Sequence, residues 1–142
     1  MARVKLDLPD SFQFSTEISI RINDINYGGH LGNDTVLSLV HEARVRFLKH
    51  LGFTEKDIGG TGIIMSDAVL VYKAEGFYGE VLTIEVTVNE FSSRGCDFLY
   101  RLSNKENGKE IARVKTGIVF YDYENKKIVS VPAIFKSHFE KN

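Results

Sequence analysis

The sequence predicts an α+β protein in which one long helix packs against an antiparallel sheet. Positions 35–51 form the only long stretch with the hydrophobic pattern of a buried helix. One segment before it and four after it show the alternation or the β-branched content of strands. The links between the later segments are short and contain glycine, which is typical of antiparallel hairpins. The helix must cover one face of the sheet, because no other element is available to do so.

The first strand is predicted over positions 14–22, where apolar or β-branched residues alternate with polar ones from Phe14 to Ile22. Positions 23–34 follow with three glycines and several Asn and Asp residues. This composition indicates a loop or a short turn of helix that leads directly into the long helix.

The long helix is predicted from Thr35 to Leu51, with Asp34 as its N-cap and Gly52 just after its C-cap. Its first half is apolar on almost all sides, which indicates that the helix is buried. Basic residues gather in its second half, where positive charge favours the helix C-terminus.

Strand-like runs follow at 63–75, 80–90, 97–103 and 110–121, with glycine links at 76–79, 92–95 and 107–108. This order predicts an antiparallel meander. A short strand near 126–131 and a helical tail over 132–142 complete a single domain spanning residues 1–142, with its core at about 14–131. The helix covers only one face of the sheet, so we expect a second subunit on the other face and hence a homodimer.

Composition narrows the function classes. The net charge of −1 and the pI near 6.4 argue against a partner that is nucleic acid or an anionic membrane. The sequence has no long apolar run, so we predict no signal peptide and no membrane span. Cys96 is the only cysteine, which excludes an internal disulfide and favours the cytoplasm. His41, His50 and His138 do not have the spacing of metal ligands, so we predict no metal site.

The loop and the helix carry a family resemblance. The segment from Arg21 to His30, RINDINYGGH, is followed by Glu42-Ala43-Arg44 and by Phe47-Leu48-x-x-Leu51-Gly52. Together these segments resemble the hot-dog-fold acyl-CoA thioesterases, and most closely the 4-hydroxybenzoyl-CoA thioesterase group. The YKAE sequence at 72–75 and the Gly-Glu pair at 79–80 are similar to the strand and turn that follow the helix in that family. The resemblance covers positions 14–122.

The resemblance implies a hot-dog fold, in which a five- or six-stranded antiparallel sheet wraps around one long central helix. It also implies a homodimer, or a homotetramer built from two such dimers, with the active site at the subunit interface. The implied substrate is an acyl-CoA or acyl-carrier thioester. Coenzyme A would then be part of the substrate, and no separate cofactor is expected.

One position departs from the family pattern. The family carries Asp-x-Asp in the loop and uses the second Asp as the catalytic carboxylate, whereas this chain has Asp24-Ile25-Asn26. An amide does not titrate in this range, so Asn26 cannot act as a base, although it could orient a water molecule or the thioester carbonyl. Loss of a general base typically lowers the rate by about 10² to 10⁴.

Three groups are candidates to replace the missing carboxylate. His30 has a side chain whose ordinary pKa suits general-base catalysis, and its alternative role is a structural hydrogen bond in the loop. Asp24 is a second candidate, with an Asx-turn as its alternative role. Glu42 lies on the helix, where it could act on water or instead pair with Arg46 or Arg21.

The remaining candidates would bind the substrate. Gly28 and Gly29 would let the backbone approach a ligand closely. The N–H groups of Gly32, Asn33 and Asp34 are the oxyanion-hole candidates, because the N-terminus of a helix offers unpaired donors. We expect aromatic residues to line an acyl pocket, and the candidates are Tyr27, Tyr72, Phe77 and Tyr78. We expect cations to contact the phosphates of coenzyme A, and the candidates are Lys73, Arg94 and Arg113.

Three functions remain open. The first is hydrolysis of an acyl-CoA thioester. The second is hydration of an enoyl-CoA, since hydratases of this fold use an Asp-x-Asn-Pro-x-His loop; here Tyr27 replaces the proline and one extra residue precedes His30. The third is a non-catalytic acyl-CoA-binding protein that has lost the carboxylate, for which Asn26 is the direct argument.

Overall fold

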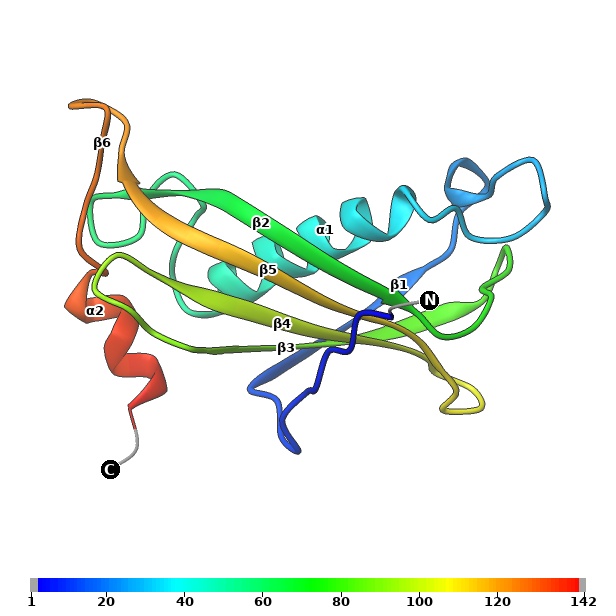
Figure 1. Ribbon diagram of the computed structural model, residues 1–142. Coiled ribbons are helices and arrows are strands. Elements are labelled where there is room, and N and C mark those ends of the chain that lie inside the picture. The colour runs from blue at the N-terminus through cyan, green and yellow to red at the C-terminus, as the bar shows by residue number, and fades with distance from the viewer. Residues whose placement is uncertain (1–2, 141–142) are drawn as a thin grey trace.

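The helix α1, Thr35–His50, lies along one face of a curved antiparallel sheet (Figure 1). This computed structural model describes residues 3–140, so residues 141–142 of the predicted tail lie outside the described part. The strands are β1 (Phe14–Ser19), β2 (Gly62–Tyr72), β3 (Val81–Asn89), β4 (Gly95–Asn104), β5 (Glu110–Asp122) and β6 (Lys127–Ile128). The short helices are η1 (Ile22–Asp24), α2 (Ala133–Lys136) and η2 (Ser137–Phe139).

The strand order in the sheet is β1-β3-β4-β5-β2, with β6 paired to β5. Strands β3, β4 and β5 are consecutive hairpins, as predicted. The predicted hairpin between β2 and β3 is wrong: β2 pairs with β5, and residues 73–80 cross the end of the sheet to reach β3. The reason is that β3 has β1 on one side and β4 on the other, which leaves it no free edge for β2.

The core lies between α1 and the sheet. The buried face of the helix carries Val36, Leu39, Val40, Ala43, Phe47 and Leu48. The ring of Phe47 is 1% exposed and contacts the rings of Phe14 in β1, Phe98 in β4 and Phe139 in the C-terminal tail. This one side chain therefore joins three parts of the fold that lie far apart in the sequence.

The C-terminus of α1 ends as the sequence predicts. Gly52 adopts a φ of 91°, a conformation that favours glycine. Its N–H donates to Lys49 O and that of Phe53 donates to Leu48 O, which is the Schellman pattern of a helix end. The N-terminus differs from the prediction, because Asp34 stands at the N-cap position but forms no side-chain capping bond with the rest of the described chain.

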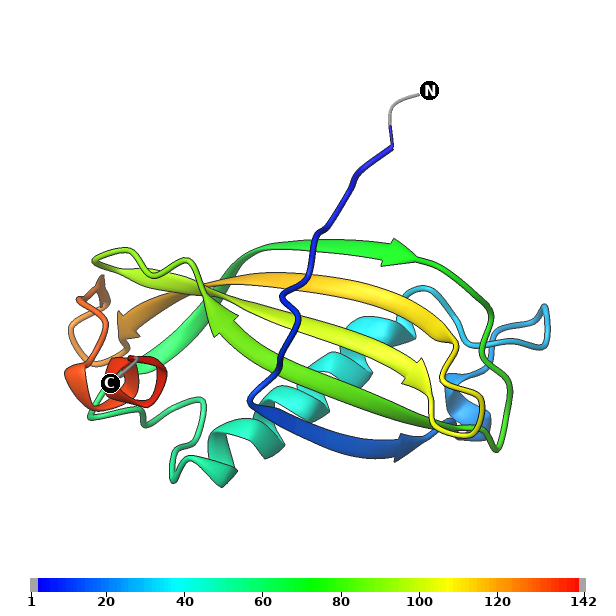
Figure 2. The same ribbon diagram turned by 90° about the horizontal axis from the view of Figure 1, so that it is seen from below.

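The face of the sheet opposite α1 carries charged side chains, and the second subunit expected on this face stays a prediction. Arg101 and Arg113 on neighbouring strands share Glu110, with nitrogen–oxygen distances of 3.0 and 2.9 Å. Residues 3–13 also cross this face (Figure 2). They are held there by a hydrogen bond from Arg113 Nη1 to Leu6 O at 3.0 Å and by Phe12, whose ring lies under the Arg101 guanidinium.

One helix packed in a six-stranded antiparallel sheet confirms the predicted hot-dog fold. The predicted strand boundaries agree with the structure to within a few residues. The predicted first strand at 14–22 is longer than β1. Strand β1 ends at Ser19 because the chain turns into η1 at Arg21.

We predict that Phe47→Ala lowers the free energy of unfolding by about 3–5 kcal/mol, because it leaves a cavity where three structural elements meet. Urea unfolding followed by circular dichroism would measure the change. The control is Lys49→Ala, an exposed position on the same helix, for which we expect a change of less than about 0.5 kcal/mol. Equal losses in the two variants would contradict the central position of Phe47.

Candidate functional site

The loop before α1 is a closed, hydrogen-bonded unit. The N–H of Asn26 donates to His30 O and the N–H of Gly29 donates to Asn26 O, each at 3.0 Å. Gly29 has a φ of 84°, which a residue with a side chain would adopt only with strain. The loop is tied to the crossing segment 73–80 by a bond from Leu31 N–H to Gly76 O at 2.7 Å.

The structure brings Asn26 and His30 together. The Oδ1 atom of Asn26 accepts the N–H of Gly28 at 2.9 Å, so the amide forms an Asx-type turn and its NH₂ group remains for other contacts. A Cβ atom at position 28 would lie 3.2 Å from Asn26 Oδ1 and 3.4 Å from His30 Nε2. Gly28 therefore leaves room for both polar groups to face the same small region.

The imidazole of His30 makes only long polar contacts with its neighbours. Its Nδ1 atom lies 3.4 Å from Leu31 O, and its Nε2 atom lies 3.9 Å from the carboxylate of Glu75. The side chain is 33% exposed, so it can meet a ligand that approaches the loop.

Asp24 and Glu42 instead make structural contacts: Glu42 forms the ion pair that was its alternative role, whereas Asp24 caps η1 and pairs with Arg21 and does not form the expected Asx-turn. Asp24 is 3% exposed, and its Oδ2 atom accepts the N–H of Arg21 at 2.8 Å while the Arg21 guanidinium bonds both of its oxygens. Glu42 pairs with Arg46 at 2.8 Å on the surface of α1. Arg46 also bonds Thr16 Oγ1, so this pair connects the helix to β1.

The three oxyanion-hole candidates are not equivalent. The N–H of Gly32 already donates to Asp24 O at 3.0 Å. The N–H groups of Asn33 and Asp34 have no acceptor within residues 3–140. The hydroxyl of Tyr72 donates to Asn33 O at 3.0 Å. This bond fixes the peptide between Asn33 and Asp34, and thereby the direction of the Asp34 N–H, because a trans peptide places its N–H opposite its carbonyl.

The predicted substrate-binding residues divide into two groups. Tyr27, Tyr72, Lys73, Phe77 and Tyr78 are all exposed, and they belong to the loop, the last residue of β2 and the crossing segment at one end of the sheet.

Neither predicted arginine joins this group within one chain, although Arg113 pairs with Val71 near the same end of the sheet. Arg94 lies beside the β3–β4 turn, where its Nη1 atom donates to Ile128 O. Arg113 lies on the opposite face of the sheet with Glu110.

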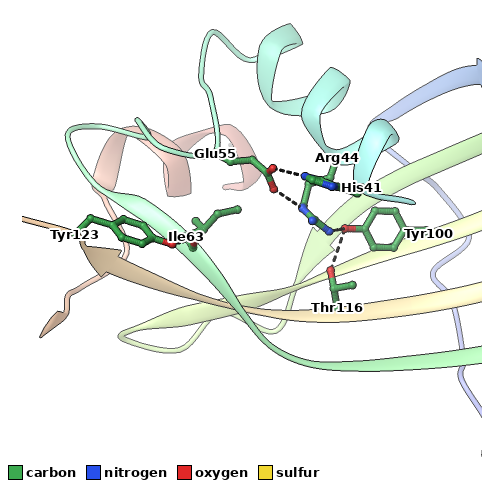
Figure 3. A network of polar contacts seen from close by, with 7 residues as sticks. All are labelled: His41, Arg44, Glu55, Ile63, Tyr100, Thr116 and Tyr123. Atoms are coloured by element: carbon green, nitrogen blue, oxygen red, sulfur yellow. Dashed lines mark hydrogen bonds and ion pairs between the residues drawn. The ribbon is translucent and has the colours of Figure 1, made fainter. Parts of the chain in front are cut away.

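A second polar cluster lies further along α1 (Figure 3). Arg44 is only 7% exposed. Its Nε atom donates to Glu55 Oε2 at 2.8 Å, and its Nη1 atom donates to Tyr100 Oη at 3.2 Å. His41 Nε2 lies 2.7 Å from the other oxygen of Glu55. Tyr100 Oη lies 2.9 Å from Thr116 Oγ1, so the chain of contacts runs from the helix surface into the sheet.

The contacts within this cluster shift the pKa of Glu55. Burial would raise the pKa of Glu55, but hydrogen bonds from Arg44 and His41 outweigh it and hold that pKa below its ordinary value. Outside the cluster, burial raises the pKa of the Cys96 thiol to about 12, so this thiol is protonated at neutral pH and is unsuited to act as a nucleophile.

The cluster forms one side of a pocket of about 670 Å³. Arg44, Glu55, His41 and Lys56 provide its polar lining. Its other side is apolar and comes from the start of β2, where Ile63, Ile64 and Met65 line it together with Tyr123.

No sequence pattern predicted this pocket as a site. One signal was present, since Arg44 stands on the apolar face of the predicted helix and a charge there requires a buried partner. Nothing in the local sequence indicates that the partner is Glu55, eleven positions later in a connecting loop.

One family model matches most of the chain. The model of the Thioesterase-like superfamily matches residues 20–139. No functionally curated protein matches the sequence significantly. Within residues 3–140, no helix combines the length and hydrophobicity required to cross a membrane.

Solved structures share the fold over most of their length. A 1,4-dihydroxy-2-naphthoyl-CoA thioesterase from Synechocystis is 20% identical, with a TM-score of 0.80, covering 87% of this chain and 93% of that one. A DHNA-CoA thioesterase from Staphylococcus aureus is 21% identical, with a TM-score of 0.77 and coverage of 88% and 85%. A member of the thioesterase superfamily from Jannaschia sp. CCS1 is 18% identical, with a TM-score of 0.81 and coverage of 92% and 83%.

We predict that Glu55→Gln lowers the free energy of unfolding at pH 7 by about 2 kcal/mol, because it removes the carboxylate partner of a buried guanidinium. The pKa of Glu55 is lowered in the folded protein, so its contribution is complete above the ordinary Glu pKa and is lost as the pH falls through the folded value. The difference between the natural protein and the variant should therefore shrink below about pH 4.5. Urea unfolding at a series of pH values would measure it.

The control is Glu42→Gln, which breaks a half-exposed ion pair and should cost less than about 0.5 kcal/mol. A Glu55→Gln difference that is the same at pH 7 and pH 3.5 would contradict the assigned role of the carboxylate.

Proposed function

The chain belongs to the thioesterase-like superfamily, and we propose that it hydrolyses an acyl-CoA or acyl-carrier thioester at the N-terminus of α1. The observation that carries the proposal is the pair of free N–H groups of Asn33 and Asp34 beside the Asn26–His30 loop. These donors stand at the start of a helix of 16 residues, whose dipole also favours negative charge.

The chemistry follows from this arrangement. Water attacks the thioester carbonyl, and its oxygen becomes an oxyanion that the N–H groups of Asn33 and Asp34 would stabilise. The carbon–sulfur bond then breaks and gives a carboxylic acid and the free thiol. The hydroxyl of Tyr72 supports the site by holding the Asn33 carbonyl, so that the donors are oriented before the substrate arrives.

We assign the role of general base to His30. It is the titratable side chain next to Asn26, and its imidazole is partly exposed with only long contacts to its neighbours. The NH₂ group of Asn26 can position the attacking water or the carbonyl oxygen. Asp24 is unsuited to this role, because both of its oxygens are occupied by Arg21.

We also propose that the active protein is a homodimer that pairs through β2. This strand is an edge of the sheet, with β5 on one side only, and its residues 64–68 are exposed. An edge strand of 11 residues presents a row of backbone donors and acceptors that a second copy can satisfy. Analytical ultracentrifugation would test the dimer, and a monomer at micromolar concentration would contradict it.

The activity test is release of free thiol from a panel of short, long and aromatic acyl-CoAs. Aromatic thioesters belong in the panel because one of the similar structures is named as a 1,4-dihydroxy-2-naphthoyl-CoA thioesterase. We predict saturable release, and a decrease in kcat of about 10² to 10⁴ in His30→Ala through loss of the base. The matched control is His50→Ala, which changes an exposed histidine at the far end of α1 and should leave kcat unchanged.

The Asn26→Asp variant separates the alternatives. A rate increase in this variant would show that a carboxylate still works in this loop. Thiol release only in Asn26→Asp, with none from the natural protein, would indicate an acyl-CoA-binding protein. Loss of enoyl absorbance from an enoyl-CoA without thiol release would indicate a hydratase, and no reaction in any variant would overturn the proposal.

A further inference from the structure

The N-terminal segment, residues 3–13, runs across the sheet toward the edge formed by β2 (Figure 2). The ring of Phe12 lies under the guanidinium of Arg101 in β4, and the carbonyl of Leu6 accepts a hydrogen bond from Arg113 in β5. Arg113 pairs with Val71 of β2, the outermost strand on this side of the sheet. From residue 12 to residue 6 the segment therefore passes from β4 to β5 and approaches the edge.

The first residues of the segment continue past this edge. Three residues of extended chain span about 10 Å, whereas neighbouring strands are only about 4.8 Å apart. Leu6 already lies at β5, next to the edge strand, so residues 3–5 are long enough to pass β2. Figure 2 shows this end of the segment beyond β2, where the described part of the chain has no further strand.

The side chains of the segment alternate between apolar and charged over the sequence VKLDL, residues 4–8. Leu6 and Leu8 are half-buried, while Lys5 and Asp7 are exposed. Alternate side chains of an extended chain point to the same side, so Val4 belongs with Leu6 and Leu8 to the side that faces the sheet. Val4 is nevertheless 65% exposed. The apolar side of the segment thus extends one step further than the sheet of a single chain.

A second copy paired through β2 would supply the missing surface, because it continues the sheet past the same edge. In an antiparallel pair centred on the exposed residues 64–68, the end of one β2 near Val71 lies beside the start of the other. The start of β2 pairs with the end of β5, where Val119 is half-buried. Its neighbours Ile118 and Phe120 belong to the core beside α1, so Val119 points to the face that residues 3–13 cross.

We propose that residues 3–5 bind a second copy of this chain, with Val4 packed near Val119 on the neighbouring sheet. Each subunit then holds the other, because a two-fold axis repeats the contact. This inference rests on the dimer proposed above and deepens it by naming a second surface through which the two copies interact. Arg3 and Lys5 lie on the other side of the segment and stay in solvent.

Photo-cross-linking tests the contact directly in the full chain. The cross-linking amino acid p-benzoylphenylalanine replaces Val4, and a mixture of ordinary and ¹⁵N-labelled protein is irradiated. We expect covalent dimers that contain one chain of each kind. Digestion with trypsin and mass spectrometry should then place the link on the peptide of residues 116–126, which contains Val119.

The matched control has the same cross-linker at Asp10. This residue is exposed and belongs to the same segment, but it lies between the two anchoring contacts over the sheet of its own chain. We expect it to give links within one chain only. Links from position 4 that stay within one chain would overturn the inference, and so would equal yields of covalent dimer from the two positions.

A substitution measures how much the contact contributes. Val4→Asp should raise the dissociation constant of the dimer by about tenfold or more, because each dimer loses two apolar contacts. Val4 is exposed in one chain, so the circular dichroism spectrum should not change. The control is Ser11→Asp, which makes the same change of charge at an exposed position of the segment and should leave the dissociation constant unchanged. Analytical ultracentrifugation would measure both.

The proposals fail in different ways. A natural protein that dimerises with the same dissociation constant as Val4→Asp would overturn this inference and leave pairing through β2 intact. A natural protein that stays monomeric would contradict the dimer and this inference together. Thiol release from acyl-CoA is a separate measurement, and its absence from a dimeric protein would contradict the hydrolysis alone.

Discussion

Burial of α1 against the sheet is the constraint on which the rest of this structure depends. The helix presents one apolar face to the strands, and Phe47 and Leu48 on that face are almost completely buried. The same face carries Arg44, so a positive charge enters the protein interior together with the apolar side chains. The charge requires a carboxylate, and Glu55 provides it from the loop that follows the helix. This pairing ties the loop to the helix, and its two residues form part of the pocket lining beside the start of β2.

The same constraint accounts for what the sequence could and could not predict. The helix boundaries, the glycine at its C-terminus and the individual strands were predicted, because each depends on residues that are neighbours in the chain. The pairing of β2 with β5 was not, because glycine in a link indicates a turn and says nothing about which strand lies beside the next one. The chain segment that crosses the opposite face of the sheet was not predicted for a related reason. This segment, residues 3–13, reaches that face from the chain terminus, and nothing in its local sequence indicates which strands it crosses.

At the candidate site, the sequence indicated the loop and the helix N-terminus, and three-dimensional contacts show which of these residues are already engaged within the chain. Asp24 and Gly32 bond to other parts of the loop, so they hold its shape. Asn26 and His30 remain available to a ligand. The amide of Asn26 accepts the Gly28 N–H, a bond that a carboxylate in its place could accept equally well. The loop can therefore keep one shape with either residue, while only the carboxylate could carry a proton during the reaction.

The segment 3–13 has a consequence for the order in which the molecule assembles. Its hydrogen bond joins Leu6 to Arg113, positions that are 107 residues apart. Contacts over such a separation close a long loop of chain and are entropically costly to form early in folding. The segment can dock only after β4 and β5 have paired, since Arg101 and Arg113 on these two strands are its binding partners. We expect it to be the last part to join the folding chain and the first to leave under mild denaturation, while the hot-dog core stays closed.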